Sequence, residues 1–224
     1  MKDRVTLEAT QEGVSEDAVK DYGRRCEAIG RERRNTADLQ DAMDHPEFKK
    51  RHHDLLDQLA AEQQLRKPIM ERRPFATIKL GTHKSVKDLR KALLDAGYRI
   101  GDWGDDILKR INVASKPEDV DIVVVSVAEL GFPNGATRAQ IYEKALSMGL
   151  GLCPAEVGPQ WRLQYADQPM GEWILVGMEP ISVSGGRLRV FSVARDEGGR
   201  WLYGHRGHPA GVWDGDDRWA FRRK

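Results

Sequence analysis

The stretch VDIVVVSVAEL, residues Val120 to Leu130, is the strongest indication of the fold in this sequence. Its β-branched residues occupy positions that point to both faces of a sheet, a pattern typical of a strand that is buried on both sides. The longest apolar run within it, Ile122 to Val125, is far shorter than the roughly 18 residues of a membrane-spanning helix. We therefore expect a sheet with other elements packed against both faces.

Helices are predicted on either side of this strand. Ser85 and Asp88 have the spacing of a capping box, and so do Thr137 and Gln140. The first helix should end at a glycine, Gly97, and the second at Gly149. The segment Tyr98 to Arg110 between them is expected to form a turn and a short amphipathic helix.

After Leu152 the pattern changes to strands. WRLQY alternates, with Trp161, Leu163 and Tyr165 on one face, and EWILVGMEPI is apolar on both faces. RLRVFSVARD, RWLYGH and RWAFRRK follow at hairpin spacing, separated by glycine-rich turns. Helices come first and strands follow, so the sequence predicts an α+β fold: an N-terminal helical module, then a mixed helix and strand body that ends in an antiparallel sheet.

The first 74 residues differ in pattern from the rest. Val19, Cys26, Leu55, Leu56 and Leu59 lie on a narrow apolar stripe in a highly charged background. Such a stripe is typical of a helical hairpin or a coiled coil. We expect residues 1–74 to form a helical module that mediates self-association or binds a protein partner, and residues 75–224 to form the body.

The overall composition limits the function. The 224 residues include 36 Lys and Arg against 35 Asp and Glu, a net charge of +1, and the balance holds in each third of the chain. Proteins that grip nucleic acid usually carry a basic patch, so nucleic-acid binding is possible but not favoured. The N-terminus lacks the apolar core of a signal peptide, and Cys26 and Cys153 form no CxxC pair. A cytoplasmic protein without membrane contact is expected.

Three motifs resemble those of an uncharacterised family of small bacterial hypothetical proteins. They are GDWGDDIL at residues 101–108, ELGFPNGATRAQIY at 129–142 and LCPAEVGPQWRLQYADQPMGEW at 152–173. The resemblance covers about residues 75–224 and implies a unit that starts near Phe75. It implies no activity and no catalytic residue.

The segment GLCPAEVGPQWRLQYADQPMGEW, residues 151–173, is the first candidate site. Cys153 fits a buried thiol better than a nucleophile, because no base or cation is placed beside it by the sequence. Glu156 and Arg162 are expected to form an ion pair at a corner of the chain. If a ligand-binding surface exists, it should lie where this segment meets the loop around Asp102 and Trp103, since turns can present polar groups that strands would bury. The candidate residues are Asp102, Trp103, Cys153, Glu156, Arg162, Gln164, Tyr165 and Asp167.

Three other patterns contain residue types that can carry chemistry. Asp102, Asp105 and Asp106 could bind Mg²⁺ or Ca²⁺, but acidic residues in the first turn of a helix are explained as well by the helix dipole. His205 and His208 have HxxH spacing in a glycine-rich turn, which favours a loop over a metal site. The C-terminal strands interleave arginines with aromatic residues, which indicates either a platform for single-stranded nucleic acid or the solvated face of a sheet.

The sequence contains no phosphate loop, no dinucleotide fingerprint and no nucleophile elbow. A non-enzymatic binding or regulatory module that acts through a partner or ligand is therefore the favoured function, with no metal and no cofactor. A metal-dependent hydrolase or nuclease is the first alternative. Binding of single-stranded nucleic acid by the C-terminal sheet is the second.

Overall fold

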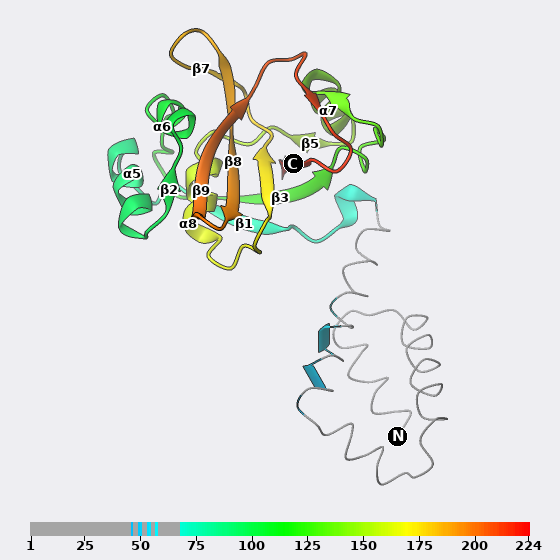
Figure 1. The fold of residues 1–224 in the computed structure, drawn as a ribbon, viewed down its shortest axis with the longest axis horizontal. Coiled ribbons are helices and arrows are strands. Elements are labelled where there is room, and N and C mark those ends of the chain that lie inside the picture. The colour runs from blue at the N-terminus through cyan, green and yellow to red at the C-terminus, as the bar shows by residue number, and fades with distance from the viewer. Residues whose placement is uncertain (1–45, 47–48, 51–52, 55–56, 58–67) are drawn as a thin grey trace. The chain divides into compact units, whose positions relative to one another are not determined.

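A computed structural model describes residue 46, residues 49–50 and 53–54, residue 57, and the continuous stretch 68–224 (Figure 1). Contacts divide the chain into two units, Met1–Pro68 and Ile69–Lys224. The helical module predicted for residues 1–74 falls almost wholly outside the described residues, so the structure does not support it. Its apolar stripe and its role in association likewise lie outside what is described.

The second unit is built on one mixed sheet whose main path runs β1-β3-β11-β6-β8-β9-β2. Two short strands attach to it, β5 to β11 and β7 to β8, and β10 pairs with β4 in a separate ribbon. The strands are β1 (Ala76–Leu80), β2 (Arg99–Ile100), β3 (Glu118–Ser126), β4 (Ala136–Thr137), β5 (Leu150–Gly151), β6 (Trp173–Val176), β7 (Ile181–Ser182), β8 (Leu188–Asp196), β9 (Gly199–Arg206), β10 (Val212–Trp213) and β11 (Arg218–Arg223).

The apolar stretch at residues 120–130 supplies most of β3, as predicted, but the strand ends at Ser126 and residues 127–130 form a turn. The strand lies between β1 and β11, antiparallel to both. Ile122 and Val123 are consecutive and point to opposite faces, yet both are buried. The prediction of a strand covered on both sides is confirmed.

The two capped helices are also confirmed. In α5 (Val86–Asp95) the hydroxyl of Ser85 accepts a hydrogen bond from the backbone N–H of Asp88. In α7 (Arg138–Ser147) Thr137 and Gln140 form the complete capping box. The predicted short helix is α6 (Asp102–Leu108). A 3₁₀ turn, η1 (Ile69–Glu71), precedes β1.

The predicted fold class is wrong. The described residues form a mixed, sheet-rich half-barrel with four helices and eleven strands, not a helical part followed by an antiparallel sheet. The C-terminal strand β11 inserts between β3 and β6, antiparallel to the first and parallel to the second. Hairpin spacing indicates only pairings between neighbours in sequence, so it gave no sign that the last strand would join the first ones.

The predicted strand WRLQY is a helix, α8 (Val157–Gln164). Trp161 and Tyr165 are four residues apart and stack on one face of it, with 5.9 Å between ring centroids. Over five residues, this spacing satisfies a helical period as well as an alternating one. Pro159 lies in the first turn, where its missing N–H costs no intrahelical hydrogen bond.

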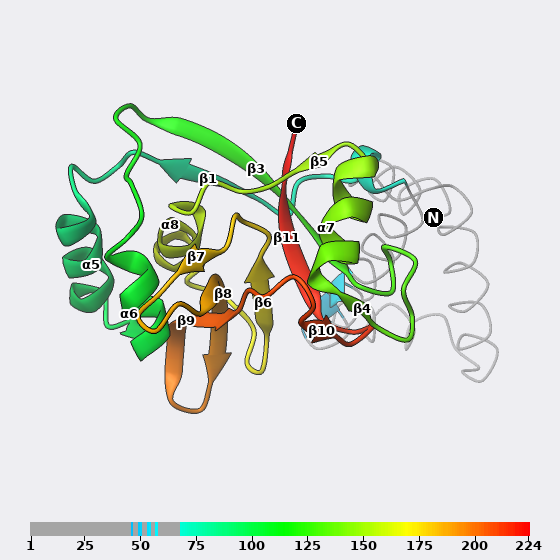
Figure 2. The same ribbon diagram turned by 90° about the horizontal axis from the view of Figure 1, so that it is seen from above.

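The helices cover the two faces of the sheet unequally (Figures 1 and 2). One face of β8 carries Phe191, which lies so close to Gly158 of α8 that an added Cβ there would be 2.7 Å from the ring. On the opposite face α7 covers β11, where Tyr142 packs edge-on against Trp219 and Phe221. That second face is left open over part of β6, β8 and β9.

Candidate functional site

Glu156 is a buried structural carboxylate. Its side chain is 2% exposed and accepts hydrogen bonds from the backbone N–H groups of Gly81, at 2.8 Å, and Ala114, at 2.6 Å. The side-chain amide of Gln160 donates a third at 2.9 Å. These bonds tie the start of α8 to the loops that flank β1 and β3.

Arg162 is fully buried, and the ion pair predicted between it and Glu156 does not form. The guanidinium donates to the side chain of Gln168, to the carbonyl of Tyr165 and, at 3.3 Å, to the carbonyl of Ala194. It also lies 4.9 Å above the ring of Tyr98. Every one of these partners is neutral, so Arg162 fastens the end of α8 to β8 as a buried cation.

Cys153 is a buried thiol, as expected. Its Sγ donates to the carbonyl of Ala220 at 3.6 Å, and burial raises the pKa of the thiol to about 12. A group with this pKa is uncharged at neutral pH and is therefore a weak nucleophile.

The remaining candidates lie in different places. The side-chain amide of Gln164 donates to the carbonyl of Lys79 and accepts from its N–H. It therefore satisfies the backbone of β1 at this residue, as a neighbouring strand would. Tyr165 donates to Glu172 at 2.7 Å, and Asp167 is exposed. Asp102 is exposed at the start of α6, and Trp103 packs on Gly204 of β9.

The structure does not bring the two predicted halves of the site together. Trp103 lies beside Arg189 at one end of β8, whereas Arg162 contacts Ala194 near the other end. Five residues of strand separate these contacts by roughly 17 Å. Residues 156–162 are buried and form a structural corner, whereas the end of the segment, at residues 169–173, is mostly exposed.

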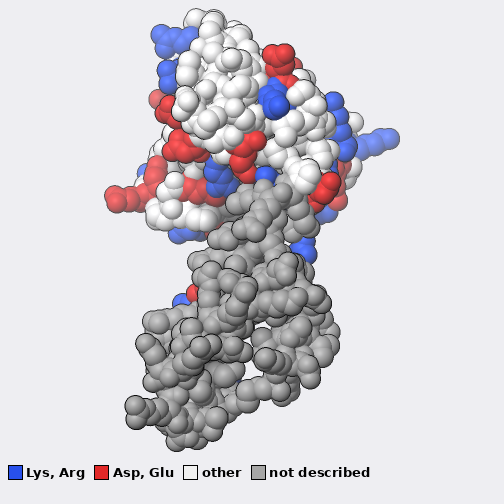
Figure 3. All heavy atoms as spheres, turned by 90° about the vertical axis from the view of Figure 1, so that its right-hand side faces the viewer, with Lys and Arg blue, Asp and Glu red and all other residues white. Residues whose placement is uncertain are grey.

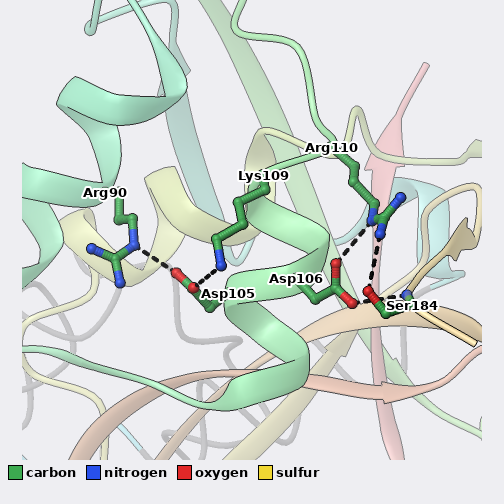
Figure 4. Close-up of polar contacts among 6 residues, drawn as sticks. All are labelled: Arg90, Asp105, Asp106, Lys109, Arg110 and Ser184. Carbon is green, nitrogen blue, oxygen red and sulfur yellow. Dashed lines mark hydrogen bonds and ion pairs between the residues drawn. The ribbon is translucent and has the colours of Figure 1, made fainter.

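The adjacent aspartates of α6 are both held by ion pairs (Figure 4). Asp105 joins Arg90 of α5 and Lys109, each at 2.6 Å; burial acts to raise its pKa, but the two cations outweigh burial and lower it. Asp106 pairs with Arg110 and accepts from the backbone N–H of Ser184 at 2.8 Å.

The hydrogen bonds from Ser184, first its N–H and then its hydroxyl, lower the pKa of Asp106 to about 2, together with Arg110. The two carboxylates thus fix α6 to α5 and to the turn before β8. Within residues 68–224 and the few described before them, no group of three or more His, Cys, Asp or Glu side chains is placed to hold a metal ion.

A groove of about 340 Å³ lies on the open face of the sheet and is the best candidate for a ligand site. We call it the aromatic groove. Its lining residues are Gly171, Glu172, Trp173, Ala194, Arg195, Asp196, Tyr203 and His205. Trp173 is 41% exposed, which is unusual for so large an apolar side chain in a folded body.

Strand register explains how the aromatic groove forms. Ala194 of β8 lies directly between Trp173 of β6 and Trp201 of β9, its two cross-strand neighbours. Because alternate residues of a strand share a face, Trp201, Tyr203 and His205 project on the same side. The small side chain of Ala194 leaves space between the flanking rings.

The rings stand in two groups on either side of that space. Trp201 and Tyr203 stack at 4.9 Å with an angle of 10° between their planes, and Arg99 lies 5.2 Å from the Trp201 ring. Trp173 meets His205 edge-on at 4.1 Å. A flat ring that enters the space can continue the stack on Tyr203.

The polar groups of the aromatic groove are mostly engaged. Asp196 accepts hydrogen bonds from the indole N–H of Trp201 and the hydroxyl of Tyr203, and Glu172 pairs with Arg218 at 2.7 Å. Burial, followed by the charges of Arg189 and Arg206, lowers the pKa of His205 to about 4, so its ring is neutral at pH 7. The surface is thus aromatic and close to neutral.

No protein-family model, no curated protein and no solved structure matches this chain. Among the helices of the described part, none is both long enough and apolar enough to cross a membrane.

The aromatic residues of the C-terminal strands are evident in the sequence, but the groove that they line is not. The alternation of Trp201, Tyr203 and His205 does predict that they share a face. Nothing in the sequence indicates that Trp173 and Ala194 are their neighbours, or that this face is the one left open.

Proposed function

We propose that this protein is a non-enzymatic binding module, and that its aromatic groove takes the unpaired bases of single-stranded nucleic acid. The observation that carries the proposal is the open row of rings beside Ala194, with free space next to Tyr203. We also propose the cytoplasm as its compartment, as expected from the sequence.

The candidate catalytic groups support a binding role over hydrolysis. Asp105 and Asp106 are neutralised by ion pairs, Glu156 is committed to two backbone N–H groups, and Cys153 is a buried thiol. A carboxylate that activates water or holds Mg²⁺ must offer free lone pairs to it.

Stacking chemistry favours nucleotide bases as the ligand. Every base has a flat face that can stack on an aromatic side chain, which contributes about 1–3 kcal/mol per base. Arg99 beside Trp201 adds a cation at the end of the stack. Basic and acidic side chains are interspersed on the face shown in Figure 3. This charge balance does not prevent stacking, but it predicts that the affinity for nucleic acid depends only weakly on salt concentration.

The first prediction concerns binding of a short fluorescein-labelled oligothymidine, measured by fluorescence anisotropy with the full chain. Trp173→Ala should weaken binding roughly tenfold, because one stacking partner is lost. Ala194→Leu should weaken it as much while keeping every aromatic ring, because the larger side chain fills the space. Trp173→Ala should melt close to the wild type, since Trp173 is exposed. Ala194 is buried at the floor of the groove, so a melting curve of Ala194→Leu must show that the variant is folded before its affinity is compared.

Leu146→Ala is the matched control. It also removes an exposed apolar side chain, but from α7. Equal affinity of all four proteins would refute the groove as the site. If the wild type fails to bind oligothymidine but a neutral oligosaccharide or a proline-rich peptide binds in a Trp173-dependent way, nucleic acid is the wrong ligand.

A further inference from the structure

Two arginines lie over the ring of one tryptophan, and a third lies opposite one of them, at the open end of the β8–β9 hairpin. The guanidinium carbons of Arg189 and Arg187 lie 4.4 Å and 5.8 Å from the centroid of the Trp103 ring. Arg206 lies directly opposite Arg189 in the register of β8 and β9, on the same face. We call Arg187, Arg189, Arg206 and Trp103 the arginine cluster.

The arginine cluster carries no compensating negative charge within the described part of the chain. None of the ion pairs there includes Arg187, Arg189 or Arg206. The Nε of Arg189 is buried and has no hydrogen-bond partner. Burial, and then the charges of Arg187 and Arg206, lower the pKa of Arg189. Like charges held this close repel one another, and an anion between them removes that cost.

We infer that the arginine cluster is an oxyanion site that binds phosphate groups. Guanidinium groups recognise phosphate through paired, charge-assisted N–H donors, and Trp103 holds two of them by stacking. The cluster lies on the face of the sheet opposite the aromatic groove, so the inference stands apart from the proposed function.

The phosphate can belong to a free anion or to a nucleic-acid strand, and two ligands distinguish these sources. Inorganic pyrophosphate and unlabelled oligothymidine are titrated separately into the full chain by isothermal calorimetry, in phosphate-free buffer at low salt. Arg189→Gln and Arg187→Gln should each weaken pyrophosphate binding about tenfold or more, because a charge-assisted contact is lost. Pyrophosphate should also raise the melting temperature of the wild type.

Lys144→Gln on α7 is the control, since it removes one exposed positive charge away from the cluster. Arg187 is exposed, so its variant keeps the test valid if Arg189→Gln unfolds. Weakening of oligothymidine alone by both arginine variants supports the site and assigns it to strand phosphates.

Absence of binding by both ligands, or equal affinity of the arginine variants and the wild type, overturns the inference. Trp173→Ala should leave pyrophosphate binding unchanged. A failure of the aromatic groove therefore does not appear as a failure of the arginine cluster.

Discussion

At the scale of single residues, Arg162 is the side chain whose role changes most between sequence and structure. In the sequence Arg162 follows Glu156 by six residues, and an ion pair is the simplest interpretation. In the structure, the buried Arg162 instead donates hydrogen bonds to carbonyl and amide oxygens. Glu156 accepts hydrogen bonds from backbone N–H groups. Which acceptor an arginine meets depends on how distant segments pack, which local sequence does not determine.

We predict that Arg162→Ala lowers the free energy of unfolding by about 2–4 kcal/mol, since buried acceptors lose their donor and a cavity is left. Urea unfolding followed by circular dichroism measures this loss. Arg162→Lys, which keeps the charge and some of the donors, should lose less. Oligothymidine affinity of the folded Arg162→Ala protein should be unchanged; a loss of affinity at full stability would make Arg162 a binding residue.

His205 makes the stability of the body depend on pH. The pKa of this imidazole is about 4 in the folded chain, against an ordinary value of 6.5, because burial and then Arg189 and Arg206 disfavour its charged form. Between pH 6.5 and 4 the unfolded chain therefore binds more protons at this residue, and acid favours unfolding. Above pH 6.5 the imidazole contributes no pH dependence.

The expected result is that the wild type loses about 1–2 kcal/mol more stability between pH 6.5 and 4 than His205→Gln does, an amount that allows for partial solvent screening. Urea midpoints at a series of pH values measure the difference. His208→Gln, which alters an exposed histidine on the next loop, should behave as the wild type. Parallel pH profiles of wild type and His205→Gln would refute the assignment.

At the scale of elements, the sequence predicts best where the signal is local. The capping boxes at Ser85 and Thr137 specify α5 and α7 because the cap and the residue it bonds are three positions apart. The β-branched run specifies β3 for a similar reason. Segment 161–165 carries no such local signal, because five alternating residues fit two periods. The contacts that fix α8, such as the close packing of Gly158 on Phe191, are long-range.

At the scale of the whole molecule, the order of the strands in the sheet cannot be predicted from the sequence pattern. The insertion of β11 between β3 and β6 pairs residues that are 92 to 100 positions apart in β3 and β11. The aromatic groove depends on the neighbouring pair β6 and β8. Both features follow from pairing between strands that are distant in sequence. The loop-closure entropy of such pairing, and the free energy gained from its contacts, cannot be estimated from a short segment of sequence. Glu156 and Arg162 stand out in the sequence by their local polarity, but long-range contacts make them structural.

The central claim is that the ligand contacts Trp173 and Tyr203 on the open face of the sheet, with the ring of Trp201 stacked on Tyr203. The chain has six tryptophans, so a proton–nitrogen NMR spectrum resolves their indole N–H groups individually, assigned by single Trp→Phe variants. On addition of oligothymidine, the indole signals of Trp173 and Trp201 should shift, while those of the fully buried Trp161 and Trp219 should stay in place. Shifts confined to other tryptophans, or none at saturating oligothymidine, would contradict the account.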